Sequence, residues 1–158
     1  MATRRCVSHG GRSRSSAPSP DQVVLERRLQ EDILAHALEE APREACGVIV
    51  GLDGVGHRVV RCRNAHPEPT SRYQVHPDVL RAAVSPMTDE SRELVAIYHS
   101  HPRSQPVPSP TDRADAARWP DPAYVLASWR TGAPELRAFR LDGEWMREVA
   151  VEARGSLG

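Results

Sequence analysis

The amino-acid sequence predicts an α/β fold in a single domain, on three grounds. The chain has 158 residues, which is enough for one domain with a buried core but too short for two of ordinary size. Short apolar runs such as CGVIVGL (46–52) and LVAIY (94–98) are typical of buried strands. Other segments, such as 29–41, repeat apolar residues at helical spacing. Strands and helices that alternate along one chain are typical of an α/β domain.

The two ends of the chain carry little that could be buried. Residues 1–21 are mostly Ser, Gly, Arg and Pro, a composition typical of a disordered tail. We therefore expect the folded domain over residues 22–152 and a short C-terminal tail over residues 153–158.

In the first half of the domain, proline and glycine mark where elements end. The apolar periodicity through 29–41 predicts a helix that Pro42 ends, and Asp53-Gly54 is a typical turn between two antiparallel strands. The expected elements, in order, are a strand at 23–26, that helix, strands at 46–52 and 57–63, a loop at 64–72, an extended piece at 73–75 and a helix from Pro77 that Pro86 interrupts.

The second half is organised around 94–98, the most apolar short run in the chain and therefore the expected central strand. Ser109 is a suitable N-cap and Pro110 suits the first helical position, so we expect a helix from there to about Trp119. The remaining expected elements are a proline-rich loop at 102–108 and strands at 123–128, 135–141 and 145–151, the last two joined at Asp142-Gly143.

Charge and cysteine content argue against several classes of function. The 21 basic residues balance the 21 acidic ones, so neither nucleic acid nor a membrane surface is expected as a partner. Three scattered cysteines without a C-x-x-C pair do not make a disulfide framework, which favours a reducing, cytoplasmic location. No apolar stretch approaches the roughly 20 residues needed to cross a bilayer, and no apolar segment follows the N-terminal arginines as it would in a secretory signal.

A candidate metal site follows the central strand. Side chains two apart in a strand point to the same face, so His99 and His101 can present two imidazoles together. A catalytic zinc ion takes three protein ligands and leaves one position for water, and Asp112 can supply the third ligand. Two ordinary alternatives stay open at this point. The histidines can be solvated or capping residues, and Ser109 with Asp112 can form a capping box at a helix start.

The motif HSHP (99–102) is followed by SPTD (109–112), with ten residues between the second His and the Asp. This arrangement resembles the signature of the JAMM, or MPN-plus, zinc metallopeptidases, and EACG (44–47) is similar to the sequence around that family's catalytic glutamate. The resemblance covers roughly residues 23–151. It implies a JAB1/MPN-type domain in which helices flank a central mixed β-sheet, as in the cytidine deaminases. The chain itself lacks the H-x-E and P-C-x-x-C elements of a deaminase.

The resemblance also implies a role for each site residue. His99, His101 and Asp112 would hold Zn²⁺. Glu44 would be the general base that takes a proton from water and passes it to the leaving amine. Ser109 would donate a hydrogen bond to the oxyanion, and a purely structural helix cap is its alternative.

Within the family, the chain is most similar to short bacterial peptidases that release cysteine from the C-terminus of a small ubiquitin-like β-grasp sulfur-carrier protein during cysteine biosynthesis. The likeness lies in EACGV (44–48), IYHSH (97–101) and AYVL (123–126). Pro102 is a feature of the wider family that these peptidases need not keep. The expected partner is therefore such a carrier, ending in Gly-Gly. Two alternatives remain, a deconjugating isopeptidase acting on ubiquitin-like modifiers and a non-catalytic MPN-type protein-binding module.

Overall fold

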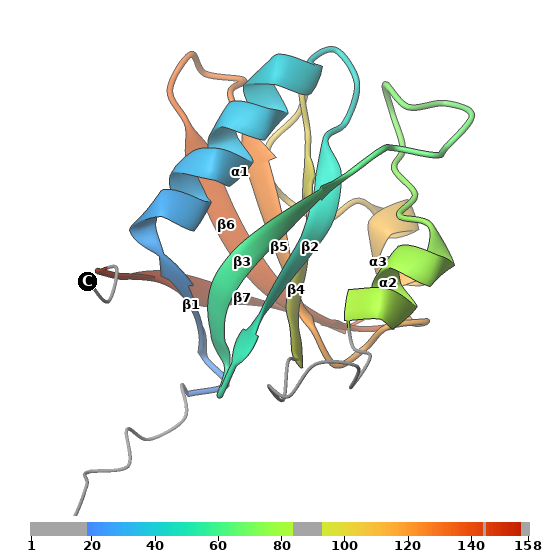
Figure 1. Cartoon of the computed structure of the whole chain (residues 1–158). Helices are drawn as coiled ribbons and strands as arrows, with labels where there is room; N and C mark the ends of the chain where they lie inside the picture. The colour runs from blue at the N-terminus through green and yellow to red at the C-terminus, as the bar shows by residue number, and fades with distance from the viewer. Residues whose placement is uncertain (1–18, 84–92, 144, 156–158) are drawn as a thin grey trace, which may run out of the picture.

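The computed structural model describes residues 19–83, 93–143 and 145–155. Within these ranges the chain forms three helices and seven strands (Figure 1). In chain order they are β1 (Gln22–Glu26), α1 (Arg27–Glu40), β2 (Cys46–Leu52), β3 (Val55–Cys62), α2 (Pro77–Ala83), β4 (Glu93–Ser100), α3 (Pro110–Ala116), β5 (Ala123–Ser128), β6 (Glu135–Asp142) and β7 (Trp145–Arg154).

The strands form one mixed sheet that closes into a barrel. Their order is β1-β3-β2-β4-β5-β6-β7, and β7 pairs in turn with β1. The pairs β1 with β3, β1 with β7 and β4 with β5 are parallel, and the others are antiparallel. The mixed sheet expected from the sequence is confirmed. Its closure into a barrel was not part of that prediction. The first half of β7 pairs with β6, and residues 150–154 pair with β1, which carries the strand past its predicted end at 151.

Helices cover both faces of the central strands, as the resemblance implies. Figure 1 shows α1 along one side of the strands and α2 with α3 on the other. Neighbouring residues of β4 point to opposite faces of the sheet. Tyr98 packs with the α1 residues Leu29 and Ile33. Ile97 packs on the other face, in a cluster that includes residues of α2 and α3. His99 lies two residues beyond Ile97 and therefore faces α3.

Gly47 allows Tyr98 to lie across β2. A Cβ atom on Gly47 would be 2.4 Å from Cε1 of the Tyr98 ring and 2.4 Å from the Val60 carbonyl oxygen, too close for either contact. With that space open, the Tyr98 hydroxyl reaches His36 of α1, and Oη lies 2.8 Å from Nδ1. This buried contact ties α1 to β4 directly beside His99.

Several element boundaries differ from those predicted from the sequence, and some of the differences have a clear cause. Residues 73–75, expected as a short extended piece, pair with no neighbouring strand, and the Gln74 N–H bonds the side chain of Asn64. Helix α3 ends three residues before Trp119, whose N–H closes a tighter turn, and the proline that follows disfavours helical backbone there. Strand β3 starts at Val55, earlier than predicted, because Val55 pairs with β1 as well as with β2.

Part of the sequence prediction lies outside the described residues. This holds for residues 1–18 of the expected N-terminal tail, for the interruption expected at Pro86 and for residues 156–158 of the expected C-terminal tail. Within the described part, Asp21 forms an ion pair with Arg147 of β7. None of the described helices combines the length and the apolar character that crossing a bilayer requires.

Candidate metal centre

Three side chains converge at the end of β4. His99 lies in the strand, His101 follows its last residue, and Asp112 lies in the first turn of α3. His99 Nε2 is 3.1 Å from His101 Nε2 and 3.3 Å from Asp112 Oδ2. His101 Nε2 is 3.2 Å from the same oxygen, and all three residues are buried. The structure thus brings together the three ligands expected from the sequence.

These separations fit a tetrahedral zinc ion. Ligand atoms that lie about 2.0–2.1 Å from zinc at tetrahedral angles are about 3.3 Å from one another, close to the observed 3.1–3.3 Å. Two imidazole nitrogens and one carboxylate oxygen are also donor types that catalytic zinc sites use. The set therefore suits one zinc ion with a fourth position left for water or substrate.

Neighbouring groups orient the two imidazoles. His101 Nδ1 lies 2.8 Å from the Gln105 carbonyl oxygen, which can only accept a hydrogen bond, so Nδ1 carries the proton. Nε2 is then left with a lone pair directed at the site. The ring of Tyr73 stacks on the His99 ring, with centroids 4.0 Å apart and planes inclined by 15°.

Helix α3 begins with a capping box that holds Asp112. Ser109 Oγ accepts the Asp112 N–H at 3.1 Å, and Asp112 Oδ2 accepts the Ser109 N–H at 2.8 Å. Burial alone would favour the neutral acid, but the adjacent His101 and His99 and the Ser109 N–H hold the pKa of Asp112 well below its usual value. The capping box and the candidate metal site therefore exist together, because the capping box fixes the Asp112 carboxylate that faces the two histidines.

Glu44 lies just before β2, which is the antiparallel neighbour of β4. Ser100 N–H donates to the Ala45 carbonyl oxygen at 2.9 Å, and Ala45 N–H donates to Ser100 Oγ at 2.8 Å. These two bonds bring Glu44 to the level of His101. Its side chain is 5% exposed, and Oε2 has no hydrogen-bond partner among the described residues.

Burial raises the pKa of Glu44 to about 7, because the charged form is poorly solvated there. In the sequence an isolated glutamate after a helix end would be read as a solvated charge, and the structure shows it buried instead. A carboxyl group with a free oxygen and a pKa near neutrality is suited to accept and return a proton at neutral pH.

A cavity of about 300 Å³ lies near the three converging donors and is lined in part by residues of α2 and α3. Tyr73, which stacks on His99, forms part of its wall, and so does Thr111, which precedes Asp112 in α3. Charged side chains, including those of Arg118 and Asp115, also line it. His99, His101 and Asp112 do not themselves line this cavity, so it neighbours the candidate metal centre through Tyr73 and Thr111.

Sequence reasoning missed Tyr73 and Asn64, two loop residues that shape the site. Tyr73 contacts a histidine 26 positions later in the chain, and Asn64 bonds the carbonyl of Glu44, 20 positions earlier. Neither residue belongs to a motif or to a periodic segment. Only an isolated polar residue between two predicted elements, Asn64 in a loop, offered a weak signal.

Comparison with known proteins identifies close relatives of the chain. A family model described as prokaryotic homologs of the JAB domain matches residues 26–142. The probable TtuB-protein conjugate cleaving protease of Thermus thermophilus is 41% identical over 119 residues, covering 75% of this chain and 76% of that protein. The desampylase of Haloferax volcanii is 34% identical over 139 residues, covering 82% and 95%. The CysO-cysteine peptidase of Mycobacterium tuberculosis is 35% identical over 122 residues, covering 75% and 82%.

A solved structure described as a metalloprotease-like zinc site in the proteasome and signalosome, named JAMM, has the same fold. It matches with a TM-score of 0.53 and 18% identity, covering 82% of this chain and 97% of that one. The expected fold class is confirmed by this likeness and by the family model. The match over residues 26–142 and the identities to named peptidases establish that the chain belongs to the prokaryotic JAB domain family and is a peptidase of the JAMM type.

Proposed function

We propose that this peptidase uses zinc to hydrolyse the amide bond after the C-terminal Gly-Gly of a small ubiquitin-like sulfur-carrier protein, and that it thereby releases cysteine. The observation that carries the proposal is the cluster of three buried donor atoms with the free carboxyl oxygen of Glu44 nearby. The substrate class is supported by the relatives, which by their names act on TtuB-protein conjugates and on CysO-cysteine.

Each site residue then has a distinct task. A zinc ion held by His99, His101 and Asp112 would supply Lewis-acid chemistry, lowering the pKa of water and polarising the scissile carbonyl. Glu44 takes a proton from the attacking water through its free carboxyl oxygen and passes it to the leaving nitrogen. Ser109 Oγ already accepts the Asp112 N–H, so its hydroxyl hydrogen remains to be donated to the developing oxyanion.

A candidate path for the extended tail of the substrate is the cavity lined by Tyr73 and Thr111, which neighbour His99 and Asp112. A tail of glycines has no side chains, so its backbone can pass closely beside Tyr73 and Thr111, which form part of the wall. Few contacts to the released residue are then needed, because binding of the carrier's globular body can hold the tail in place. A short peptide ending in Gly-Gly-Cys should consequently be a poor substrate.

A second candidate function is that of a deconjugating isopeptidase. The observation that favours it is the 41% identity to a protein named for cleaving TtuB-protein conjugates, compared with 35% to the CysO-cysteine peptidase. The zinc chemistry and the roles of the site residues would be the same, and only the leaving amine would differ.

The substrate is tested with two defined adducts. CysO carrying a C-terminal cysteine and TtuB joined to a lysine side chain are each incubated with the enzyme, and intact masses are measured over time. Loss of one cysteine residue from the first adduct supports cysteine release. Cleavage of the second adduct alone would show that the enzyme is an isopeptidase, and cleavage of neither would reject both substrate proposals.

The metal is tested separately by elemental analysis. The purified protein should hold about one zinc per chain, because two histidines and one aspartate leave a single open position. The variant His101→Ala should lose most of it. Full zinc occupancy in a protein lacking both His99 and His101 would show that the metal binds elsewhere.

A further inference from the structure

Asn64 lies in the loop that follows β3, and its amide group faces three backbone carbonyls. Nδ2 lies 3.1 Å from the carbonyl oxygen of Glu44, 2.8 Å from that of Arg72 and 3.4 Å from that of Pro69. Carbonyl oxygens only accept hydrogen bonds, so the amide nitrogen must be the atom on this side. The side chain is half-buried, where leaving these groups unbonded would be costly.

The other end of the Asn64 amide organises the same loop. Oδ1 accepts the N–H of His66 at 3.0 Å and the N–H of Gln74 at 3.2 Å. Gln74 and Arg72 flank Tyr73, whose ring stacks on His99. Asn64 therefore bonds the backbone on both sides of the residue that packs against a candidate metal ligand.

The backbone of Glu44 is held on both of its polar groups. Its N–H donates to the Pro69 carbonyl oxygen at 2.7 Å, and its own carbonyl accepts from Asn64. The side chain has a different character, because Oε2 is buried without a hydrogen-bond partner among the described residues. No bond to that oxygen fixes the carboxyl group, so its placement depends on the backbone to which it is attached.

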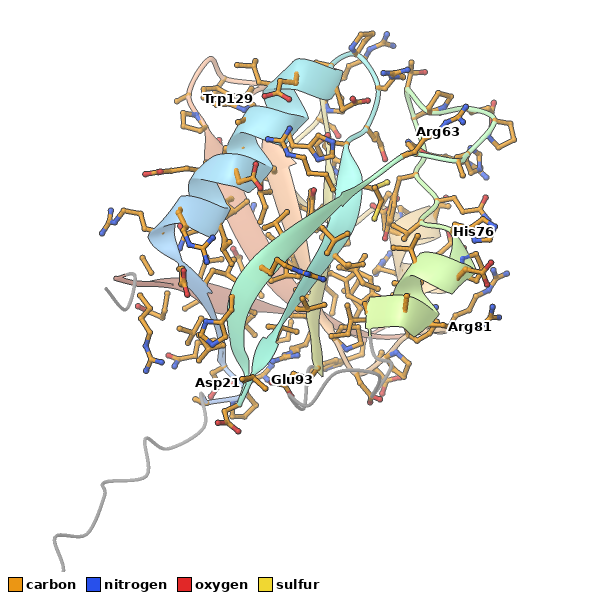
Figure 2. All side chains as sticks on the ribbon, in the orientation of Figure 1. Asp21, Arg63, His76, Arg81, Glu93 and Trp129 are labelled. Atoms are coloured by element: carbon orange, nitrogen blue, oxygen red, sulfur yellow. The ribbon has the colours of Figure 1, made fainter. Side chains whose placement is uncertain are left out.

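The loop segment between β3 and α2 is thus connected to two parts of the site. Figure 2 shows Arg63, which precedes Asn64, at one end of this segment and His76 at the other, beside α2. One side chain, Asn64, bonds the backbone of Glu44 and of the Tyr73 region together. A displacement of about 1 Å at a reacting group can slow catalysis on the order of 100-fold.

We propose that Asn64 is a positioning residue, which acts through the backbone of Glu44 to place its carboxyl group for proton transfer. This inference rests on the proposed function, since it assigns Asn64 to the reaction in which Glu44 is the base. Asn64 itself contacts no reacting atom. Its removal should impair the chemical step and leave the binding of substrate and metal in place.

The kinetic test uses the full chain and two variants. Asn64→Ala removes every hydrogen bond that the side chain makes. Asn64→Asp keeps the shape of the side chain and its accepting oxygen, but it turns a carboxylate oxygen toward the three carbonyls. On CysO-cysteine, or on the TtuB isopeptide if that is the substrate cleaved, each should lower kcat by about 10- to 100-fold. KM should stay within about twofold of its wild-type value and zinc content should be unchanged, because no ligand has been altered.

Combining Asn64→Ala with Glu44→Gln distinguishes a positioning role of Asn64 from a general loss of structural stability. If Asn64 acts only through Glu44, adding Asn64→Ala to Glu44→Gln should slow the residual reaction no further. An additive loss, a fall in zinc content or an unchanged kcat in both single variants would each overturn the proposal. The matched control is His76→Ala, which removes one side-chain bond to a backbone N–H at the other end of the same segment and should keep wild-type kcat.

A measurement that needs no substrate tests this inference independently of the proposed function. Amide hydrogen exchange of Glu44 and Ala45 should become faster in Asn64→Ala, while the amides of Val48 and Ile49 in β2 stay protected. Unchanged exchange at Glu44 would refute the positioning role even if the enzyme were active. If wild type cleaved neither adduct, the proposed function would fail, and the exchange data would still decide whether Asn64 holds Glu44.

Discussion

A single buried carboxyl group, that of Glu44, combines reactivity with a cost in stability. Its side chain is 5% exposed and its pKa is raised to about 7 by burial. An ordinary exposed glutamate would be fully ionised at neutral pH and a much weaker base. The environment that suits the residue to proton transfer is therefore also one in which its charged form is poorly stabilised.

The first prediction for this single residue is that metal binding and turnover can be separated. Glu44→Gln should keep the wild-type zinc content, because the carboxyl group is not among the three converging donors. It should lower kcat by about 10²- to 10⁴-fold, the usual contribution of a general base. Zinc content and rate are measured on the same preparation, with Glu31→Gln, an exposed residue of α1, as the control. Loss of zinc would make Glu44 a ligand, and wild-type activity would remove it from the mechanism.

The second prediction concerns the pH dependence of stability in the metal-free protein. The folded-state pKa of Glu44 is about 7 and its ordinary value is 4.5, so between these values the folded state binds more protons than the unfolded state. The free energy of unfolding therefore falls as pH rises through this window, by on the order of 3 kcal/mol. Glu44→Gln has no such dependence.

This is checked by thermal unfolding with chelator present, at pH values from about 4 to 8. The difference in Tm between Glu44→Gln and wild type should shift in favour of the variant as pH rises. A constant difference across the range would mean that Glu44 has an ordinary pKa in the folded chain.

At the scale of elements, the site depends on the contact between β2 and β4. Glu44 lies just before β2 and His99 near the end of β4, at the same edge of the strand pair, and Gly47 pairs with Tyr98 next to them. The glycine leaves room for the aromatic ring, which in turn reaches His36 of α1. Any shift between these strands would move the base relative to the metal ligands.

Gly47→Ala should therefore destabilise the protein and impair metal binding together. The added Cβ meets the Tyr98 ring and the Val60 carbonyl oxygen, and the backbone contact cannot be relieved by a side-chain movement. Overpacking of this kind typically costs about 1–3 kcal/mol. Denaturant unfolding measures the loss, and Gly155→Ala is a matched control because a Cβ there meets nothing within 4 Å. Equal stability of the two variants would show that β2 has room to move.

The sequence predicts the elements well where apolar runs are continuous. β2 and β5 begin and end where expected, because each is a mostly apolar segment bounded by a change in composition. Residues 73–75, expected to be extended, join no strand, and the Gln74 N–H bonds the Asn64 side chain. The motif residues were found because they belong to short local patterns in the sequence. Tyr73 and Asn64 belong to no such pattern and were not found. Their importance comes from contacts between distant segments, which no local pattern records.

At the scale of the whole molecule, barrel closure depends on one long strand. Residues 150–154 of β7 pair with β1, after residues 145–149 have paired with β6. The sequence indicated both flanking strands but not that they meet, because parallel pairing between the two ends of a chain leaves no spacing signal.

Ending the chain after Val149 should consequently open the barrel. The shortened protein loses every described pairing between β1 and β7 and uncovers Val23 and Leu25. We expect Tm to fall by roughly 10 °C or more, as for a loss of several kcal/mol in a chain of this size. Ending the chain after Gly155 keeps those pairs and should leave Tm unchanged. Similar melting of both truncated proteins would mean that closure contributes little.

The pairing of β1 with β7 also joins two strands that the ribosome makes more than a hundred residues apart. Glu44, His99, His101 and Asp112 all emerge before the closing strand, so a nascent chain holds every group of the site while β1 and β6 still have open edges. Pairing between such distant segments is intrinsically slow, and open strand edges are where incomplete sheets associate with one another. Chains interrupted near residue 145 should therefore aggregate more readily than chains interrupted after residue 154.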